Sequence, residues 1–499
     1  MDQGMLGDEV PIELKIDPCA KRPNILMLFS DEHNAALSGF AGHGIVRTPN
    51  LDKLAAGGVV FDEAYCNSPL CSPSRQSFMA GLHAHKIGCW NNTAAMPEDT
   101  VTWAHMLSLG GYETSLLGKM HFNGYQKMYG FDRRPVLEAN NAGETFYSYG
   151  VRTSHLWTDP LPYSDGGGGK YRGFDKAGED TPERLPIFRH DLKVLQGTLD
   201  ILAEKAAAGP NAQPWAICSS FVLPHPPWKA RGDILKHYRG KGDLPHNHKG
   251  LGRDTCDRYT QQYTGNLMDL PEDIIRNARE VYFALIEEFD EYAGRILDLL
   301  AQTGLDENTV VFYFSDHGEM AGEHGLWSKC TLLESSVRVP IIISWKGRYQ
   351  PARVAAPVSL VDLYPTFLEL AGLTMPPPLE LSGHSLLPLV EGRSGDFAGG
   401  EVFGDFEGEG WNHPRAFLRE GRYKFVYNHT AESRLYDLQT DRGEMTDLSG
   451  RPELAAVEAR LRGKLLGQFN AERIEREVLA GQVRRQIARC KNVCKDLGW

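Results

Sequence analysis

The segment Pro23-Asn24-Ile25-Leu26-Met27-Leu28-Phe29 carries a continuous apolar run from Ile25, and the polar residues Ser30-Asp31-Glu32-His33 follow at once. An apolar run of this length that stops at polar residues is typical of a strand buried on both faces of a sheet. In open α/β sheets, ligands bind at the carboxyl ends of the strands. The segment therefore predicts a buried strand with Asp31 at its ligand-binding end.

Two further segments show the same pattern. The apolar run over residues 215–223 ends at Pro224-His225. The run over residues 309–315 ends at Asp316-His317. Each of the three predicted strands therefore delivers an acid or an imidazole at its tip.

Helical patterns lie among these strands, and several of them end at a glycine, as helices commonly do. They cover residues 49–57, 71–81, 101–110, 191–207, 271–303 and 361–371. Strands that alternate with helices indicate a largely parallel sheet covered by helices. We therefore predict an α/β fold with a large, mainly parallel sheet sandwiched by helices.

The pattern changes after the run Met375-Pro376-Pro377-Pro378. Strands of period two are predicted at residues 416–419, 423–427 and 435–438, with a helix near 452–469. We expect an α/β catalytic domain over residues 1–390. A smaller C-terminal α+β domain, with an antiparallel sheet plus a helix, is expected over residues 391–469.

The tail, residues 470–499, is rich in charge but keeps apolar residues at helix-like intervals. These are Ile474, Val478, Leu479 and Val483. Such a segment either docks on the surface of its own chain or reaches a neighbouring subunit. The second alternative predicts a homo-oligomer, either a dimer or a tetramer, in which the tail acts as an oligomerisation arm.

The composition limits the class of protein. The chain has 499 residues and nine cysteines, an odd and scattered set that favours a reducing compartment. The first apolar run starts only at Ile25 and is too short for the core of a signal peptide. No uncharged apolar segment approaches the roughly 20 residues that a membrane helix needs. We expect a soluble, cytoplasmic protein with no membrane partner.

The net charge is −12, and the charges are interspersed along the chain. No basic stripe of the kind that neutralises nucleic-acid phosphates is present, so we expect no nucleic-acid partner. An anionic substrate would have to be captured by a local cationic pocket.

One cysteine stands in a reactive setting, in the segment Pro69-Leu70-Cys71-Ser72-Pro73-Ser74-Arg75-Gln76-Ser77-Phe78-Met79-Ala80-Gly81. Cys71 lies at a predicted helix N-terminus, and Arg75 follows one turn later on the same face. Both features lower the pKa of a thiol and predict a reactive sulfur. The alternative is a buried and inert cysteine, as most free cysteines are.

This segment matches the modification signature of the sulfatase family, Cys-x-Pro-x-Arg followed by an apolar residue, a small residue and glycine. A second segment, Gly111-Tyr112-Glu113-Thr114-Ser115-Leu116-Leu117-Gly118-Lys119-Met120-His121, resembles the other signature of that family, with Leu117 bulkier than usual. The resemblance extends from Arg22 to about Leu448 and is nearest to the choline-sulfatase and phosphonate monoester hydrolase branch. It implies an alkaline-phosphatase-like fold and a sulfuric ester hydrolase.

The resemblance also implies two cofactors. Cys71 would be oxidised to formylglycine by a formylglycine-generating maturation enzyme. Asp31, Asp316 and His317, with an oxygen of the modified Cys71, would bind one divalent cation. Oxygen-rich sites suit Ca²⁺, which we favour, or Mg²⁺ or Mn²⁺, and the histidine moves the site toward Mn²⁺. Many arylsulfatases have Asp-Asp where this chain has Asp31-Glu32, so the role of Glu32 stays open.

Cationic residues at family positions imply an anion site, and the catalytic residues carried over are Cys71, Arg75, Lys119, His121, His225 and Lys329. The resemblance implies that Arg75 stabilises the hydrated aldehyde, whose first hydroxyl attacks sulfur. It implies that Lys119 and Lys329 hold the sulfate oxygens, and that His225 with Lys329 protonates the leaving oxygen. His121 would deprotonate the second hydroxyl, which expels sulfate. Asn92 matches a substrate-binding position of the branch.

Other interpretations remain at this point. A phosphonate monoester or phosphodiester hydrolase would need the same cation and nucleophile, but that group has Tyr and Thr where this chain has Lys119 and His121. A non-catalytic thiol protein would use Cys71 as a redox sensor and Cys490 and Cys494 as a clip.

The substrate predicted from the resemblance is a small-molecule aryl or alkyl sulfate. Choline-specific members carry a tryptophan-rich segment after the second signature. The nearest counterpart here, residues 147–160 with Trp157, has a lower tryptophan density and argues against choline.

Overall fold

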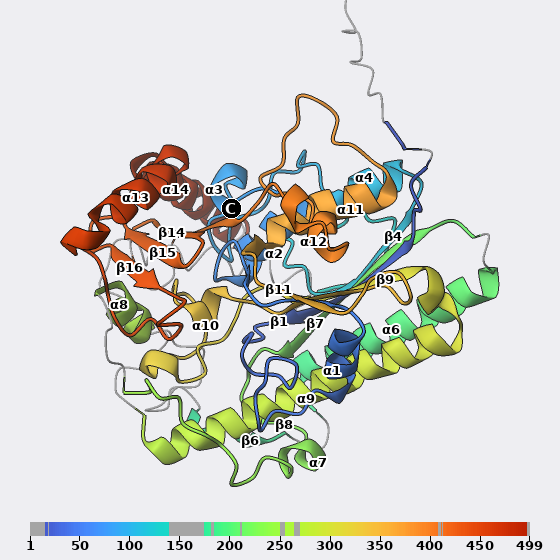
Figure 1. Cartoon of the computed structure of the whole chain (residues 1–499), viewed down its shortest axis with the longest axis horizontal. Helices are drawn as coiled ribbons and strands as arrows, with labels where there is room; N and C mark the ends of the chain where they lie inside the picture. The colour runs from blue at the N-terminus through green and yellow to red at the C-terminus, as the bar shows by residue number, and fades with distance from the viewer. Residues whose placement is uncertain are drawn as a thin grey trace, which may run out of the picture.

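A large central sheet organises the computed structural model (Figure 1). The structure describes residues 15–17, 19–138, 174–180, 184–209, 212–249, 255–263, 270–407, 411 and 413–496. Within these ranges the sheet has eight strands, in the order β11-β2-β10-β9-β1-β7-β4-β5. The strands are β1 (Asn24–Asp31), β2 (Val59–Phe61), β4 (Glu113–Gly118), β5 (Arg133–Val136), β7 (Trp215–Pro224), β9 (Thr309–Ser315), β10 (Ile341–Ser344) and β11 (Ala352–Val354).

Strand β1 is central, with β7 on one side and β9 on the other, and all three run parallel. Asp31 is paired with Pro224, and Ser30 is paired with Ser315, so the carboxyl ends of the three strands lie at one edge. Strand β10 is antiparallel to both β9 and β2. The sheet is therefore mixed but mostly parallel, as predicted. The carboxyl ends of β1, β7 and β9 lie next to one another in it.

Helices cover both faces of the sheet (Figure 1). Those on one side are α1 (Pro49–Ala56), α6 (Pro186–Ala208), α7 (Gly232–Leu235) and α9 (Glu272–Gln302). Those on the other side are α2 (Cys71–Ala80), α4 (Trp103–Leu109), α11 (Leu363–Ala371) and α12 (Leu387–Val390). Helix α6 begins before the predicted residue 191 because Pro186 occupies its first position, which favours a helix start.

The apolar run of β1 divides between two cores. Ile25, Met27 and Phe29 belong to one buried cluster, and Leu26 and Leu28 belong to another. Successive side chains of a strand point to opposite faces, so a strand between two helix layers needs apolar residues at every position. This explains why the run is continuous rather than alternating.

Shorter elements complete the body of the molecule. Strand pairs form between β3 (Ala64–Tyr65) and β12 (Val358–Ser359), and between β6 (Gly178–Glu179) and β8 (Lys229–Ala230). The short helices are α3 (Ala84–Ile87), α8 (Thr255–Tyr263) and α10 (Glu334–Val337).

The predicted small sheet is present beyond α12. It is antiparallel, and its order is β13 (Glu401–Phe406), β14 (Arg415–Glu420), β15 (Tyr423–Asn428) and β16 (Arg434–Asp437). Helix α13 (Ala455–Gln468) accompanies it. Strand β13 was not predicted, because Gly404 and Asp405 interrupt its apolar pattern.

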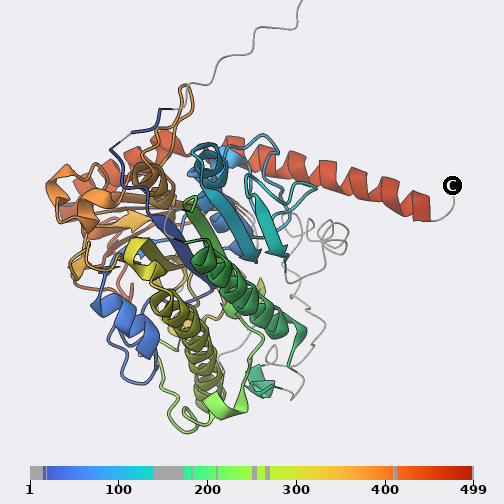
Figure 2. The same ribbon diagram turned by 90° about the vertical axis from the view of Figure 1, so that its right-hand side faces the viewer.

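The tail forms helix α14 (Ala471–Asp496), which runs out from the body of the molecule (Figure 2). Its first turns pack on the core, where Ile474 and Val478 are 0% and 2% exposed. Farther along, Val483 and Ile487 are 54% and 66% exposed. The base of the helix is therefore docked on its own chain, and the outer part leaves apolar residues open.

In the part of the chain that the structure describes, no helix has both the length and the apolar character needed to cross a membrane. The predicted counterpart of the choline-specific segment, residues 147–160, lies outside the described residues. Cys490 and Cys494 both lie on α14.

Candidate active site

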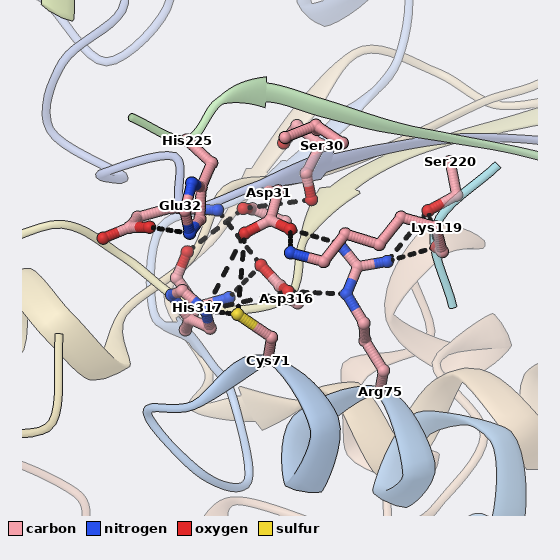
Figure 3. Close-up of polar contacts among 12 residues, drawn as sticks. Ser30, Asp31, Glu32, Cys71, Arg75, Lys119, Ser220, His225, Asp316 and His317 are labelled. Carbon is pink, nitrogen blue, oxygen red and sulfur yellow. Dashed lines mark hydrogen bonds and ion pairs between the residues drawn. The ribbon is translucent and has the colours of Figure 1, made fainter. Parts of the chain in front are cut away.

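The side chains predicted at the strand tips meet at one edge of the large sheet (Figure 3). Asp31 ends β1, and Asp316 and His317 follow β9 directly. Cys71, the first residue of α2, approaches them from the helix layer. One ligand atom from each of these residues lies within 4.8 Å of the other three, and all four residues are buried. The structure therefore brings together the four residues predicted to bind metal.

This donor set fits a divalent cation. His317 Nδ1 lies 3.0 Å from the carbonyl oxygen of Gly318, so Nδ1 carries the hydrogen and Nε2 faces the Cys71 sulfur at 3.2 Å. Burial and the nearby charge of Asp31 raise the pKa of Asp316. Two buried carboxylates so close together repel each other, and a bound cation would relieve that repulsion. The residues present are therefore those that a cation site requires.

Arg75 ties the two carboxylates to the walls of the site. Its Nε donates to Asp316 Oδ2 at 2.7 Å, and its Nη2 donates to Asp31 Oδ2 at 3.1 Å. Its Nη1 donates to the backbone oxygen of Lys119 at 2.6 Å and to the hydroxyl of Ser220 at 2.8 Å. Most of its donors are engaged in this way, so Arg75 orients the carboxylates of Asp31 and Asp316. The role expected for Arg75, stabilising the hydrated aldehyde made from Cys71, stays a prediction.

The thiol of Cys71 lies in a strongly cationic environment. Burial by itself would raise the pKa of this thiol, but the charges of Lys119, Lys329 and His317 lower it well below its ordinary value. A hydrogen bond from His121 acts in the same direction. The helix N-terminus adds a further favourable field. The sulfur atom therefore lies where negative charge on a nucleophile is stabilised, as predicted from the sequence.

Asn92 lies beside the start of α2. Its Oδ1 accepts a hydrogen bond from the backbone N–H of Ser72 at 2.9 Å, in the first turn of the helix. Asn123 Nδ2 donates to the backbone oxygen of Asn92 at 3.2 Å and so fixes its segment. This arrangement caps the helix that carries Cys71. The predicted contact of Asn92 with substrate would fall to its amide nitrogen.

Lys119 is placed by the glycine that precedes it. Gly118 has a φ of 90°, and a β-carbon there would collide with the backbone oxygen of Ser220. Glycine therefore allows β4 to end close against β7. Lys119 donates its backbone N–H to the same oxygen at 3.1 Å, and its Nζ forms an ion pair with Asp31.

His121 is held by a carboxylate that the sequence analysis did not single out. The backbone of His121 is in the left-handed region, with a φ of 60°. Glu138 accepts hydrogen bonds from the backbone N–H groups on either side, Met120 at 3.1 Å and Phe122 at 3.3 Å. Glu138 therefore braces the loop that presents His121. No motif marks Glu138, and only the fold brings it to this loop.

His225 and Lys329 meet on the other side of the site. Lys329 Nζ lies 2.9 Å from His225 Nε2 and 2.5 Å from Glu32 Oε2. Glu32 Oε2 also lies 3.1 Å from His225 Nε2. The two groups predicted to protonate the leaving oxygen are therefore in contact, and the Glu32 carboxylate lies beside both of them.

Burial indicates from which side a ligand enters. The predicted metal ligands are almost completely buried. The side chains of Lys329, Lys119 and His225 are 10%, 14% and 26% exposed. An anion approaching from solvent would thus meet cationic groups first and Cys71 behind them.

The sequence matches two family models. The model described as Sulfatase matches residues 23–373. The model described as N-sulphoglucosamine sulphohydrolase, C-terminal, matches residues 322–471. Together they span both the large sheet and the small one.

Curated relatives align over most of the chain. A choline-sulfatase of Rhizobium meliloti (strain 1021) is 30% identical, covering 93% of this chain and 90% of that protein. Arylsulfatase K of Bos taurus is 28% identical, covering 87% of this chain and 80% of that protein.

Solved structures share the fold. A protein solved in complex with its substrate D-glucosamine-2-N,6-O-disulfate has a TM-score of 0.70 at 21% identity, covering 92% of this chain and 98% of that one. The phosphonate monoester hydrolase of Agrobacterium radiobacter also has a TM-score of 0.70, at 22% identity, covering 89% of this chain and 95% of that one. These likenesses confirm the predicted alkaline-phosphatase-like architecture. Because the family model covers most of the chain and the choline-sulfatase aligns over nearly all of it, the chain belongs to the sulfatase family of sulfuric ester hydrolases.

Proposed function

We propose that the chain hydrolyses sulfate monoesters of aryl or alkyl alcohols, using formylglycine made from Cys71 and one divalent cation. The observation that carries this proposal is the position of Cys71. It lies within 4.8 Å of the ligand atoms of Asp31, Asp316 and His317, and it occupies the modification signature. We favour Ca²⁺ because oxygen donors dominate, with Mn²⁺ or Mg²⁺ as alternatives.

Two groups would supply chemistry that the twenty amino acids lack. Hydrated formylglycine offers one hydroxyl for attack at sulfur and a second for the release of sulfate. The cation, held by Asp31, Asp316 and His317, offers Lewis acidity beside these hydroxyls. Full activity would thus depend on a maturation enzyme that oxidises Cys71.

The remaining steps belong to side chains already in place. Lys119 and Lys329 would hold the sulfate oxygens and stabilise the charge that builds on them. As the bond between sulfur and the ester oxygen breaks, that oxygen would take a proton from the pair Lys329 and His225 and leave as the alcohol. His121 would accept the proton of the hydroxyl that releases sulfate. Water consumed in the cycle balances the alcohol and sulfate formed.

A second candidate is the hydrolysis of phosphonate monoesters or phosphodiesters at the same site. The observation in its favour is the shared fold of the phosphonate monoester hydrolase of Agrobacterium radiobacter. Tetrahedral anions of similar size use the same clamps, so side activity is expected. Lys119 and His121 favour sulfate as the main substrate. Membership of the sulfatase family and the carboxylates around Cys71 favour an enzyme over a non-catalytic thiol protein.

The metal-replete protein should be assayed against the nitrophenyl esters of sulfate, phosphate, a phosphate diester and a phosphonate, with choline sulfate included because of the choline-sulfatase relative. We expect kcat/KM to be highest for the aryl sulfate, because this chain has Lys119 and His121 where phosphonate monoester and phosphodiester hydrolases have Tyr and Thr. A higher value for any phosphorus ester would contradict the sulfate assignment while leaving the family membership intact.

We also infer that the chain is divided into domains near residues 390 and 469. The tail that follows residue 469 would act as an oligomerisation arm. Val483 and Ile487 on α14 support this, since they are exposed on a helix that leaves the body. The scattered cysteines support a reducing, cytoplasmic compartment.

Truncation after Gly481 should therefore convert a dimer or tetramer into a smaller species, because it removes Val483 and Ile487 but keeps the docked Ile474 and Val478. Light scattering measures the mass of both chains. An unchanged mass after truncation would show that the tail is not an oligomerisation arm.

A further inference from the structure

Glu32 follows a predicted metal ligand but is turned to a different part of the site. Its backbone is left-handed, with a φ of 64°, which is uncommon for glutamate. Two contacts hold this conformation: its N–H donates to Asp316 Oδ1 at 3.1 Å, and its carbonyl oxygen accepts from the Tyr282 hydroxyl at 2.5 Å. Its carboxylate accepts from Lys329 Nζ at 2.5 Å and from Ser328 Oγ at 3.2 Å.

The place that a cation would need beside Glu32 is taken by an ammonium group. In the described part of the chain, Glu32 groups with Asp31 and His225 as a possible set of metal ligands, and it is not a member of the set that Asp31 forms with Cys71, Asp316 and His317. Lys329 Nζ lies 2.5 Å from Glu32 and 2.9 Å from His225, so it contacts both. A metal ion bound to Glu32 and His225 would lie against the Lys329 ammonium, and the two positive charges would repel each other.

The hydrogen bonds of Lys329 leave one donor for a ligand. An ammonium has three N–H groups. One is directed to Glu32 Oε2 and one to His225 Nε2. His225 Nδ1 contacts the carbonyl oxygen of Pro226, so Nδ1 carries the hydrogen and Nε2 is free to accept from Lys329. With two N–H groups fixed, the direction of the third is set.

A second acidic side chain, that of Glu319, fixes the backbone of this segment. Glu319 Oε1 accepts from the backbone N–H of Ser328 at 2.5 Å and of Ala321 at 2.9 Å. Ser328, directly before Lys329, has a left-handed φ of 67°. Glu319 therefore anchors the backbone of the segment and Glu32 anchors the end of the Lys329 side chain, and a side-chain hydrogen bond joins these two residues. This arrangement restricts the motion of the ammonium.

We propose that Glu32 is a positioning residue, and not a ligand of the cation: it holds the Lys329 ammonium, which in turn donates to His225, so that the third N–H of Lys329 is presented to the sulfate ester on the side of its leaving oxygen. This inference rests on the proposed sulfatase reaction. It assigns a role to a position at which many sulfatases carry a second aspartate.

The test compares Glu32→Gln with the parent on a series of aryl sulfates whose phenols differ in acidity, and measures bound metal by mass spectrometry. We expect Glu32→Gln to keep the parent's metal content. Its kcat should fall by about 100-fold for the least acidic phenol but by less than about 10-fold for nitrophenol, which needs little protonation to leave. The double variant Glu32→Gln/Lys329→Gln should be no slower than Lys329→Gln, because Glu32 acts through Lys329.

Glu288→Gln is the matched control. Glu288 is another fully buried glutamate in an ion pair, with Arg184 at 2.6 Å, and it lies outside the site. Its replacement should lower stability without changing the dependence on the leaving group. If Glu32→Gln fails to fold, Glu32→Asp, which withdraws the carboxylate from Lys329, should give the same pattern with a smaller effect.

Loss of the cation from Glu32→Gln, or an equal fall of kcat for every phenol, would overturn the positioning role. The parent, assayed in the same batch, separates this result from failure of the proposed function. A parent that binds the cation but does not hydrolyse any sulfate ester would refute the sulfatase reaction itself.

Discussion

Replacement of Cys71 by serine is expected to reduce the turnover of sulfate esters by more than about 1000-fold, the scale of losing an essential nucleophile. Serine can form an ester with the sulfuryl group, but it has no second hydroxyl with which to expel sulfate. It also cannot be oxidised by the same route as a thiol. The first turnover would then leave the enzyme blocked, so a stoichiometric burst with no steady state is the expected time course.

The change should leave the fold intact, because Cys71 and serine differ by one atom at the start of α2. Thermal unfolding of both proteins checks this. Cys19→Ser, at an exposed cysteine that is not among the predicted site residues, should keep full activity. A Cys71→Ser enzyme that cycles at the parental rate would contradict the formylglycine mechanism.

Asp31→Asn should cost the enzyme both its cation and its activity. Asp31 is fully buried and contacts Arg75, Lys119 and the Cys71 thiol. Removing its charge leaves the two cationic side chains less neutralised, and these would repel a divalent ion. We expect at least about 100-fold weaker metal binding, more than a change outside the ligand shell causes. Loss of the associated charge stabilisation should lower turnover on the order of 1000-fold.

Two measurements test this prediction: the metal content after dialysis and the turnover of nitrophenyl sulfate. Asp290→Asn is the matched control, since Asp290 is buried and binds the backbone N–H groups of Asn50 and Leu51 rather than the site. It should lower stability and keep the cation. Chelation of the parent should reproduce the inactivity of Asp31→Asn and be reversed by added metal, whereas the variant should not recover. Full metal content in Asp31→Asn would remove Asp31 from the ligand set.

Much of the fold could be predicted because burial on both faces leaves a strong signal. Residues 25–29 are apolar at every position, and such a run has few alternatives between turn residues. Strand β13 was missed because Gly404 and Asp405 break its pattern. Asp405 is nevertheless buried, and it binds His85 at 2.8 Å, a contact between residues far apart in sequence. Only tertiary packing makes that strand favourable.

The residues of the candidate site also differ in how far the sequence could predict them. Cys71, Arg75 and Asp31 stand in motifs or at strand tips, where residue type and position indicate their chemistry. Glu32 is adjacent to Asp31, so sequence alone left both roles open. The left-handed backbone at Glu32 separates the two carboxylates and directs one to Lys329.

Glu138 shows a further limit of sequence reasoning. Its effect on the His121 loop depends on two backbone hydrogen bonds. Any residue can supply a backbone N–H group, so hydrogen bonds of this kind leave no motif in the sequence.

The proposed sulfatase activity depends on the oxidation of Cys71. The most direct test is peptide mass spectrometry of residues 68–75, combined with the rate on nitrophenyl sulfate, for batches that differ in the extent of maturation. The formylglycine mechanism predicts a rate proportional to the fraction of formylglycine at Cys71, with a zero intercept. A rate that is independent of this fraction, or full activity in batches that retain only the thiol, would contradict it.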